Sequence, residues 1–161
     1  MEHERERLWE LMQGHTACMM VTRDGEHMRG RPMAPYVDGE GRTIRFLSSR
    51  TDPKIEEIHR EAQVALLFTD HSDRQYVSVS GKARVTADRA LVEELWGPAA
   101  ETWFPGDAQT ADVVVIEVEP SAAEYWDNDA NVLRTVMEVA KGYLTDEAPD
   151  LGENAKLGRT G

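Results

Sequence analysis

Alternation of hydrophobic and polar positions runs through most of the chain and predicts a protein built mainly of β-strands. The clearest example is residues 76–86, where Val77 and Val79 fall on one face and Ser78 and Ser80 on the other. Further segments of strand type cover residues 16–23, 28–37, 43–49, 63–70, 112–120 and 122–127. Short polar turns that contain glycine separate the first three of these segments, which indicates antiparallel neighbours.

Helical spacing of apolar residues appears between and beside the strands. A first helix is predicted to end at Gly14, and a last helix is predicted over residues 132–139. Between them, Asp52 and Asp88 are good N-caps for two more helices, the second of which is expected to end at Gly97. Because no regular β-α-β alternation occurs, the pattern favours a mainly β fold with added helices, an antiparallel barrel of six to seven strands.

The domain organisation is expected to be simple. One folded domain is predicted over residues 1–145, and the polar, glycine-containing stretch 146–161 is predicted to be a loose tail. Within the segment 28–37, Pro32 and Pro35 cannot donate ladder hydrogen bonds. That segment is therefore expected to be irregular or to lie at an edge of the sheet.

Charge and cysteine content exclude several classes of function. The 161 residues carry a formal net charge of −12, which argues against nucleic acid as a partner because phosphate backbones are bound by basic surfaces. The apolar runs are far shorter than a membrane span, so no membrane partner is expected. The single cysteine, Cys18, excludes an internal disulfide, suits a reducing cytoplasm, and is expected to be an inert core residue. The histidines have no metal-ligand spacing, so no metal site is expected.

The stretch FLSSRTDPK, residues 46–54, is the first candidate for a binding site. The hydroxyls of Ser48 and Ser49 end a predicted strand, and Lys54 lies in the first turn of the following helix. A helix start with hydroxyls and an ammonium beside it can hold a phosphate. The alternative is that Asp52 caps the helix by itself, with the lysine solvated and the serines only ending the strand.

Two further groups of residues are weaker candidates. Arg29 and Arg31 share one face of a strand and suit a phosphate or carboxylate, although a cross-strand salt bridge is the commoner use of such a pair. Each of the four tryptophans could stack on a planar ligand, but core packing is more usual. No set of nucleophile, base and orienting group is recognisable, so a catalytic role would rest on a cofactor.

Five segments in the same order resemble the pyridoxamine 5′-phosphate oxidase-like superfamily of FMN-binding split barrels. They are RPMAPY, FLSSRTDPK, YVSVSGKARV, LWGPAAETWFPGD and AEYWD, and the likeness covers residues 5–145. The general-stress-protein group of bacteria is the branch that the chain is most similar to. The resemblance implies a split β-barrel that pairs as a homodimer and binds flavin at the interface.

The resemblance also assigns roles to residues of this chain. It matches Arg31, Ser48, Ser49 and Lys54 to the groups that hold the FMN phosphate, and it places Met33 along the backbone that faces the ring. Trp126 matches an aromatic residue that approaches the flavin from the partner chain. Trp103 is a further aromatic near the ligand in principle, but its alignment does not fix a role.

Departures from the true oxidase bear on the activity. Arg134 is not followed by the histidine of the substrate-binding pair, and Tyr36 stands at the best match for a substrate-binding lysine. Both changes argue against oxidation of vitamin B6. The expected function is a flavin-dependent oxidoreductase linked to stress response, with an unknown small-molecule substrate. The alternatives are a stress protein that stores or sequesters flavin without turnover, and a reductase that uses a deazaflavin; FAD in place of FMN also remains open.

Overall fold

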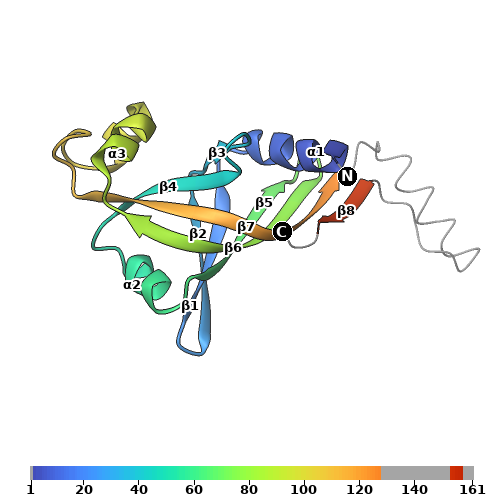
Figure 1. The fold of residues 1–161 in the computed structure, drawn as a ribbon, viewed down its shortest axis with the longest axis horizontal. Coiled ribbons are helices and arrows are strands. Elements are labelled where there is room, and N and C mark those ends of the chain that lie inside the picture. Colours follow the sequence, from blue (N-terminus) through green and yellow to red (C-terminus); the bar gives the residue numbers. More distant parts are fainter. Residues whose placement is uncertain (1, 128–152, 158–161) are drawn as a thin grey trace, which may run out of the picture.

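The computed structural model describes residues 2–127 and 153–157 (Figure 1). Its helices are α1 (Glu2–Gln13), α2 (Pro53–Arg60), α3 (Arg89–Leu95) and α4 (Pro98–Trp103). Its strands are β1 (Cys18–Asp24), β2 (His27–Met33), β3 (Tyr36–Asp38), β4 (Thr43–Ser49), β5 (Gln63–Asp70), β6 (Gln75–Thr86), β7 (Val113–Asp127) and β8 (Glu153–Leu157).

The strands form one antiparallel sheet in the order β2-β1-β5-β6-β7-β4-β3, and β8 pairs with β7 beside this path. The predicted fold class, mainly β with added helices, is confirmed. The segment predicted as one irregular strand over residues 28–37 is divided between β2 and β3, which lie at the two ends of the sheet order. The proline-containing break between them explains the division, because proline removes ladder donors.

Strand β7 is longer than the sequence indicates. The two strands predicted over residues 112–120 and 122–127 are one continuous strand of 15 residues. The register with β6 shifts between Ser80 and Gly81, so that one residue of β7 is bulged, and the Ser121 hydroxyl donates to the Ser80 carbonyl at 3.2 Å. Because the bulge accommodates the extra residue Ser121, the strand continues past Pro120, where the sequence predicts that one strand ends and another begins.

Two hydrophobic cores hold the sheet and helices together. The larger one lies on the inner face of the sheet, where alternate residues of the central strands and the apolar face of α1 are buried, among them Met12, Phe46, Leu66 and Tyr125. The smaller one lies under α3 and α4, at the end of the molecule opposite β8 (Figure 1). Helix α4 is not predicted by the sequence, because Gly97 and Pro98 together are typical of a helix end. In the structure, Pro98 is the first residue of a new helix.

Of the predicted C-terminal tail, residues 146–161, the structure describes residues 153–157. Residues 153–157 of the predicted tail form β8, which pairs with residues 123–127 of β7, so this part of the tail is strand. The helix predicted over residues 132–139 lies outside the described residues. The single domain over residues 1–145 stays a prediction.

Candidate functional site

Helix α2 joins strands from opposite halves of the sheet order. Asp52 is its N-cap and Pro53 its first residue, as the sequence predicts. Its buried face carries two apolar residues, Ile55 and Ile58, and two charged ones, Lys54 and Glu57. Because residues three apart share a face of a helix, the two charges point the same way. Lys54 bonds to β4, and Glu57 bonds to β1 and β2.

Lys54 is held in a buried position at the start of α2. Its side chain is 7% exposed, and its Nζ lies 2.8 Å from Asp52 Oδ2 and donates to Ser48 Oγ at 3.2 Å. The other oxygen of Asp52 accepts from the Lys54 backbone N–H at 3.0 Å. Burial raises the pKa of Asp52, but the bonds from Lys54 outweigh burial and hold that pKa below its ordinary value. The cap expected from Asp52 is therefore present, whereas the lysine is buried rather than solvated.

Glu57 is the centre of a second group of charges. Its side chain is 2% exposed, and its oxygens accept from Arg29 Nη1 at 2.6 Å and from Arg31 Nη2 at 2.8 Å. The Thr22 hydroxyl donates to Glu57 at 2.5 Å and accepts from Arg31 Nη1 at 2.6 Å. Burial raises the pKa of Glu57, but the bonds from Thr22 and Arg31 outweigh it, so the pKa is lowered and the carboxylate stays ionised.

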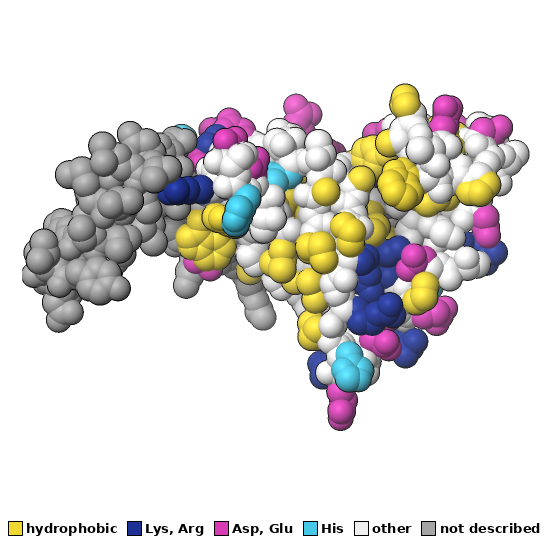
Figure 2. Space-filling view, turned by 180° about the vertical axis from the view of Figure 1, so that it is seen from behind, with side chains coloured by type: hydrophobic (Ala, Val, Ile, Leu, Met, Phe, Trp, Pro, Cys, Tyr) yellow, Lys and Arg dark blue, Asp and Glu magenta, His cyan; other side chains and the backbone are white. Residues whose placement is uncertain are grey.

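Three of the predicted site residues come together at this helix. Arg31 from β2 bonds to Glu57 of α2, and Ser48 from β4 bonds to Lys54 at the start of the same helix. The charge of Arg31 also lowers the pKa of Asp52, after the larger effects of burial and Lys54. We call Arg31, Ser48 and Lys54 the anion corner. Figure 2 shows Lys and Arg side chains gathered among acidic ones beside a band of hydrophobic side chains.

The other predicted site residues lie elsewhere. Ser49 follows Ser48 but is only half-buried, and its hydroxyl lies 3.3 Å from the Thr51 hydroxyl. Met33 is partly buried against the larger core. Trp126 is exposed near the far end of β7, twelve residues beyond Val114, the residue opposite Ser48. At about 3.3 Å per residue, roughly 40 Å of strand separates Trp126 from the residue opposite Ser48.

Two residues that contact the predicted site residues were not identified from the sequence. Glu57 lies three residues after Lys54, so the helical spacing offered a signal for a second charge on the same face. Thr22 alternates with Cys18 and Met20, which both face the core, and is fully buried. A cross-strand salt bridge was the alternative use expected for Arg29, and Asp24 on β1 lies 3.8 Å from it. The ion pair of Arg29 with Glu57 on α2 is shorter, at 2.6 Å.

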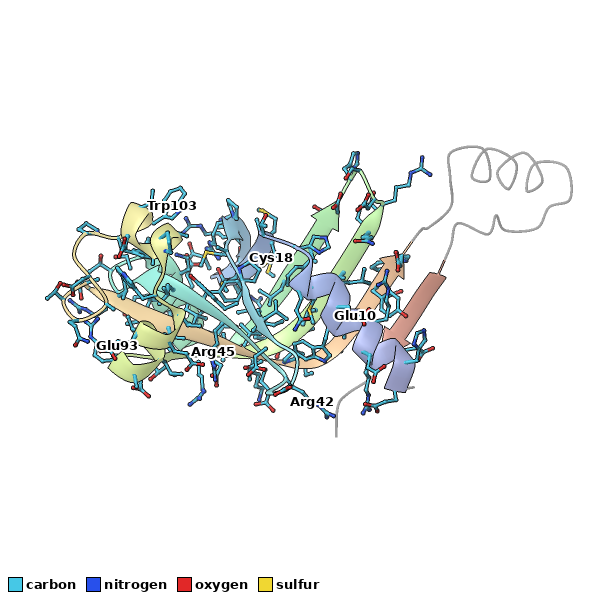
Figure 3. The ribbon with its side chains drawn as sticks, turned by 90° about the horizontal axis from the view of Figure 1, so that it is seen from above. Glu10, Cys18, Arg42, Arg45, Glu93 and Trp103 are labelled. Carbon is cyan, nitrogen blue, oxygen red and sulfur yellow. The ribbon has the colours of Figure 1, made fainter. Side chains whose placement is uncertain are left out.

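The outer face of the sheet carries exposed apolar side chains. Met19 of β1 lies directly opposite Leu67 of β5 and both are exposed, as is Met28 on β2. We call Met19, Met28 and Leu67 the apolar face. Trp103 is 79% exposed and projects from α4 at the end of the molecule (Figure 3). Tyr36, at the position matched to a substrate-binding lysine, packs against the smaller core.

The described residues also bear on two expected absences. None of their helices combines the length and hydrophobicity needed to cross a bilayer. Within the same residues, no three histidine, cysteine or acidic side chains gather as a metal site would require. Arg134, the other residue compared with the oxidase, lies outside the described part of the chain.

The family model for pyridoxamine 5′-phosphate oxidase-like proteins matches residues 3–150. The chain belongs to this family. The resemblance inferred from the five sequence segments is therefore confirmed. Membership in the pyridoxamine 5′-phosphate oxidase-like family covers both halves of the sheet, the anion corner and Trp126.

Two curated proteins are similar to this chain, and one of them is a general stress protein. General stress protein 26 of Bacillus subtilis is 30% identical over 97 residues, which is 57% of this chain and 69% of that protein. Protein bli-3 of Neurospora crassa is 26% identical over 145 residues, covering 83% of this chain and 69% of that protein.

Solved structures show the same fold. A protein of the general stress protein 26 type from Jannaschia sp. CCS1 superposes with a TM-score of 0.77 over 98% of this chain and 99% of its own, at 24% identity. The general stress FMN/FAD binding protein of Xanthomonas citri has a TM-score of 0.72 over 82% of this chain and 94% of its own, at 22% identity. The split-barrel architecture expected from the sequence is thus confirmed.

Proposed function

We propose that this protein binds FMN in a homodimer, with the flavin phosphate in the anion corner, and acts as a flavin-dependent oxidoreductase in stress response. The observation that carries the proposal is that Arg31, from β2, meets the same helix as Ser48 and Lys54, which lie six residues apart in the sequence. The name of the Xanthomonas citri neighbour, a general stress FMN/FAD binding protein, supports a flavin as the ligand.

The donors of the anion corner fit a phosphate ester. Lys54 has three N–H donors, and two partners are found for them in the described part of the chain, Ser48 and Asp52. Arg31 has five N–H donors, of which Glu57, Thr22 and the Met20 carbonyl take three. Donors therefore remain on both cations, and charge-assisted bonds to a phosphate are worth about 1.5–3 kcal/mol each.

A homodimer would complete the flavin site. The strand between the residue opposite Ser48 and Trp126 is far longer than FMN, which favours a ring contact from a second chain for a phosphate held by Ser48 and Lys54. A second subunit can supply its own Trp126. The apolar face supports such pairing, because contiguous exposed apolar side chains commonly mark interaction surfaces.

The bound flavin would supply the redox chemistry, and the protein would bind, orient and shield it. Among the residues that the structure describes, the anion corner offers no obvious proton donor for a substrate, since its lysine and its arginine are ion-paired. We therefore propose that substrate reduction relies on the flavin and on water rather than on an acidic side chain of the protein.

The first test is the identity of the ligand and the role of Lys54. The protein as isolated should be yellow, and mass analysis of the released ligand should distinguish FMN from FAD and from a deazaflavin. Lys54→Met, which keeps an unbranched side chain but removes the ammonium, should weaken FMN binding at least tenfold and riboflavin binding much less. Lys82→Met, at an exposed lysine of β6, is the matched control. Equal FMN affinity in the two variants would contradict the proposal.

The second test separates an enzyme from a flavin-storing protein. NADH or NADPH added without oxygen should bleach the flavin absorption, and a small-molecule acceptor should restore it over repeated cycles. Bound flavin that no donor reduces would instead support the flavin-storing alternative.

The third test concerns the dimer. Leu67→Lys places a charge on the apolar face while leaving the buried face of β5 unchanged, so it should shift the protein from dimer to monomer in light scattering and weaken flavin retention. A parent protein that is monomeric with flavin bound would refute the shared site.

A further inference from the structure

The anion corner contains its own negative charges. Two carboxylates, Asp52 and Glu57, lie among three cations, Arg29, Arg31 and Lys54, and each carboxylate bonds to a cation that the proposed phosphate would use. A phosphate that arrives there meets repulsion from both carboxylates as well as attraction from the cations. Charge alone would give the two carboxylates the same effect on phosphate binding.

Their geometry is different. Asp52 approaches the Lys54 ammonium at 2.8 Å, and its side chain is over one-third exposed to solvent. Glu57 is almost wholly buried, and both of its oxygens are bonded, to Arg29 on one side and to Arg31 and Thr22 on the other. It therefore fixes the guanidinium of Arg31 in one orientation.

We infer that the two carboxylates act in opposite directions: Asp52 competes with the phosphate for Lys54, whereas Glu57 positions Arg31 to receive it. This inference rests on the proposed flavin site and adds a device that sets its affinity. Without Glu57, Arg31 would lose its fixed orientation. Phosphate binding would then have to order this long side chain, and the conformational entropy lost in doing so would weaken the binding. Without the charge of Asp52, Lys54 would be available to the phosphate from the outset.

Asparagine and glutamine variants test this directly. Asp52→Asn removes the charge but keeps a good N-cap, because asparagine and aspartate cap helices about equally well. Glu57→Gln removes the charge and weakens the bonds to both arginines. The control is Glu56→Gln, the same change one residue away on α2 at a side chain that is 73% exposed.

The quantity to measure is the ratio of the affinities for FMN and riboflavin, because it isolates the contribution of the phosphate from general effects on the fold. We expect Asp52→Asn to raise this ratio and Glu57→Gln to lower it, each by about tenfold, and Glu56→Gln to change it less than twofold. An increase in both site variants would mean that charge alone acts. No change in either would mean that the carboxylates have only a structural role. Each of these results overturns the inference.

A second variant covers the case in which Glu57→Gln does not fold. Thr22→Val removes the hydroxyl that accepts from Arg31 and donates to Glu57, but it changes no charge and little volume. It should lower the ratio in the same direction as Glu57→Gln. An unchanged ratio in a folded Thr22→Val protein would refute the positioning role.

The outcome also distinguishes this inference from the proposed function. If the parent binds FMN better than riboflavin but the two site variants do not change the ratio in opposite directions, the proposed function stands and the inference fails. If the parent binds no flavin, the proposed function fails, and inorganic phosphate becomes the probe. Its stabilisation of the protein against heat must then rise in Asp52→Asn and fall in Glu57→Gln for the inference to survive.

Discussion

Replacing Gly81 with alanine tests a close backbone approach between β6 and β7. Gly81 lies where β6 and β7 change register. A Cβ atom built there would lie 2.5 Å from the Glu119 carbonyl oxygen and 3.0 Å from Val118 Cγ1. Since the nearest atom belongs to the backbone of β7, it cannot move aside as the end of a flexible side chain can. Strand β7 must shift as a whole, or the pairing at the bulge must open.

The expected cost follows from this crowding. Forcing an extra carbon into a packed site typically costs about 1–3 kcal/mol, while alanine in place of glycine restricts the unfolded chain and returns about 0.4–1 kcal/mol. We expect Gly81→Ala to lower the free energy of unfolding by roughly 1–2 kcal/mol, which is a fall of roughly 1 M in the urea midpoint. Tryptophan fluorescence at one fixed protein concentration is a suitable measurement, because association would otherwise change the apparent stability.

Gly97→Ala is the matched control for this measurement. A Cβ at Gly97 meets nothing within 4 Å, and its φ of −163° is extended backbone that alanine also adopts. The control shares the effect on the unfolded chain, and its own cost is limited to the replacement of glycine by the poorer cap alanine at the start of α4. If Gly81→Ala unfolds at the same urea concentration as Gly97→Ala, the inferred crowding at the bulge is wrong.

Three further predictions concern buried polar groups. Burial raises the pKa of the Cys18 thiol to about 12, so iodoacetamide at pH 8 should modify it only after unfolding; rapid reaction of the folded protein would contradict its burial. Asp127→Asn removes the buried carboxylate that binds a guanidinium of α1 and should cost about 1.5–3 kcal/mol by urea unfolding, so an unchanged midpoint would show that this ion pair contributes nothing. Burial raises the pKa of Glu117, but the bonds from Arg45 and Arg84 outweigh it and lower the pKa. That stabilisation is present above the ordinary value of 4.5 and is lost as pH falls through the lowered pKa, so Glu117→Gln should flatten the dependence of the urea midpoint on pH between about 5 and 3.

Local patterns in the sequence were enough to predict most of the individual elements. The alternation in β6 gives its buried face directly, and Asp52 with Pro53 fixes the start of α2. These features depend on residues within a few positions of one another. Pro98 shows the limit of such reasoning, because proline is equally suited to follow one helix and to begin the next.

Long-range pairing accounts for most of what the sequence left undetermined. The bulge in β7 depends on its register against β6, and β8 pairs with a segment that ends 26 residues before it begins. The anion corner also depends on contacts between residues far apart in the sequence. Its hydroxyl and ammonium were foreseen as a pair within FLSSRTDPK, but the role of Glu57 appears only when β2 and α2 are brought together. The family likeness supplied Arg31, which spacing alone offered only as a weak candidate.

The length of β7 connects the fold to the proposed site. One end of this strand pairs with β4 beside Ser48, and the other end carries Trp126 between β6 and β8. A chain that kept both groups for one ligand would have to fold the strand back on itself, which a continuous ladder with β6 forbids. A flavin whose phosphate lies beside Ser48 and Lys54 is therefore proposed to contact the Trp126 of another subunit. The length of β7 thus joins the contact between Trp126 and the flavin ring to dimerisation in one hypothesis. A variant that no longer dimerises should also lose the ring contact.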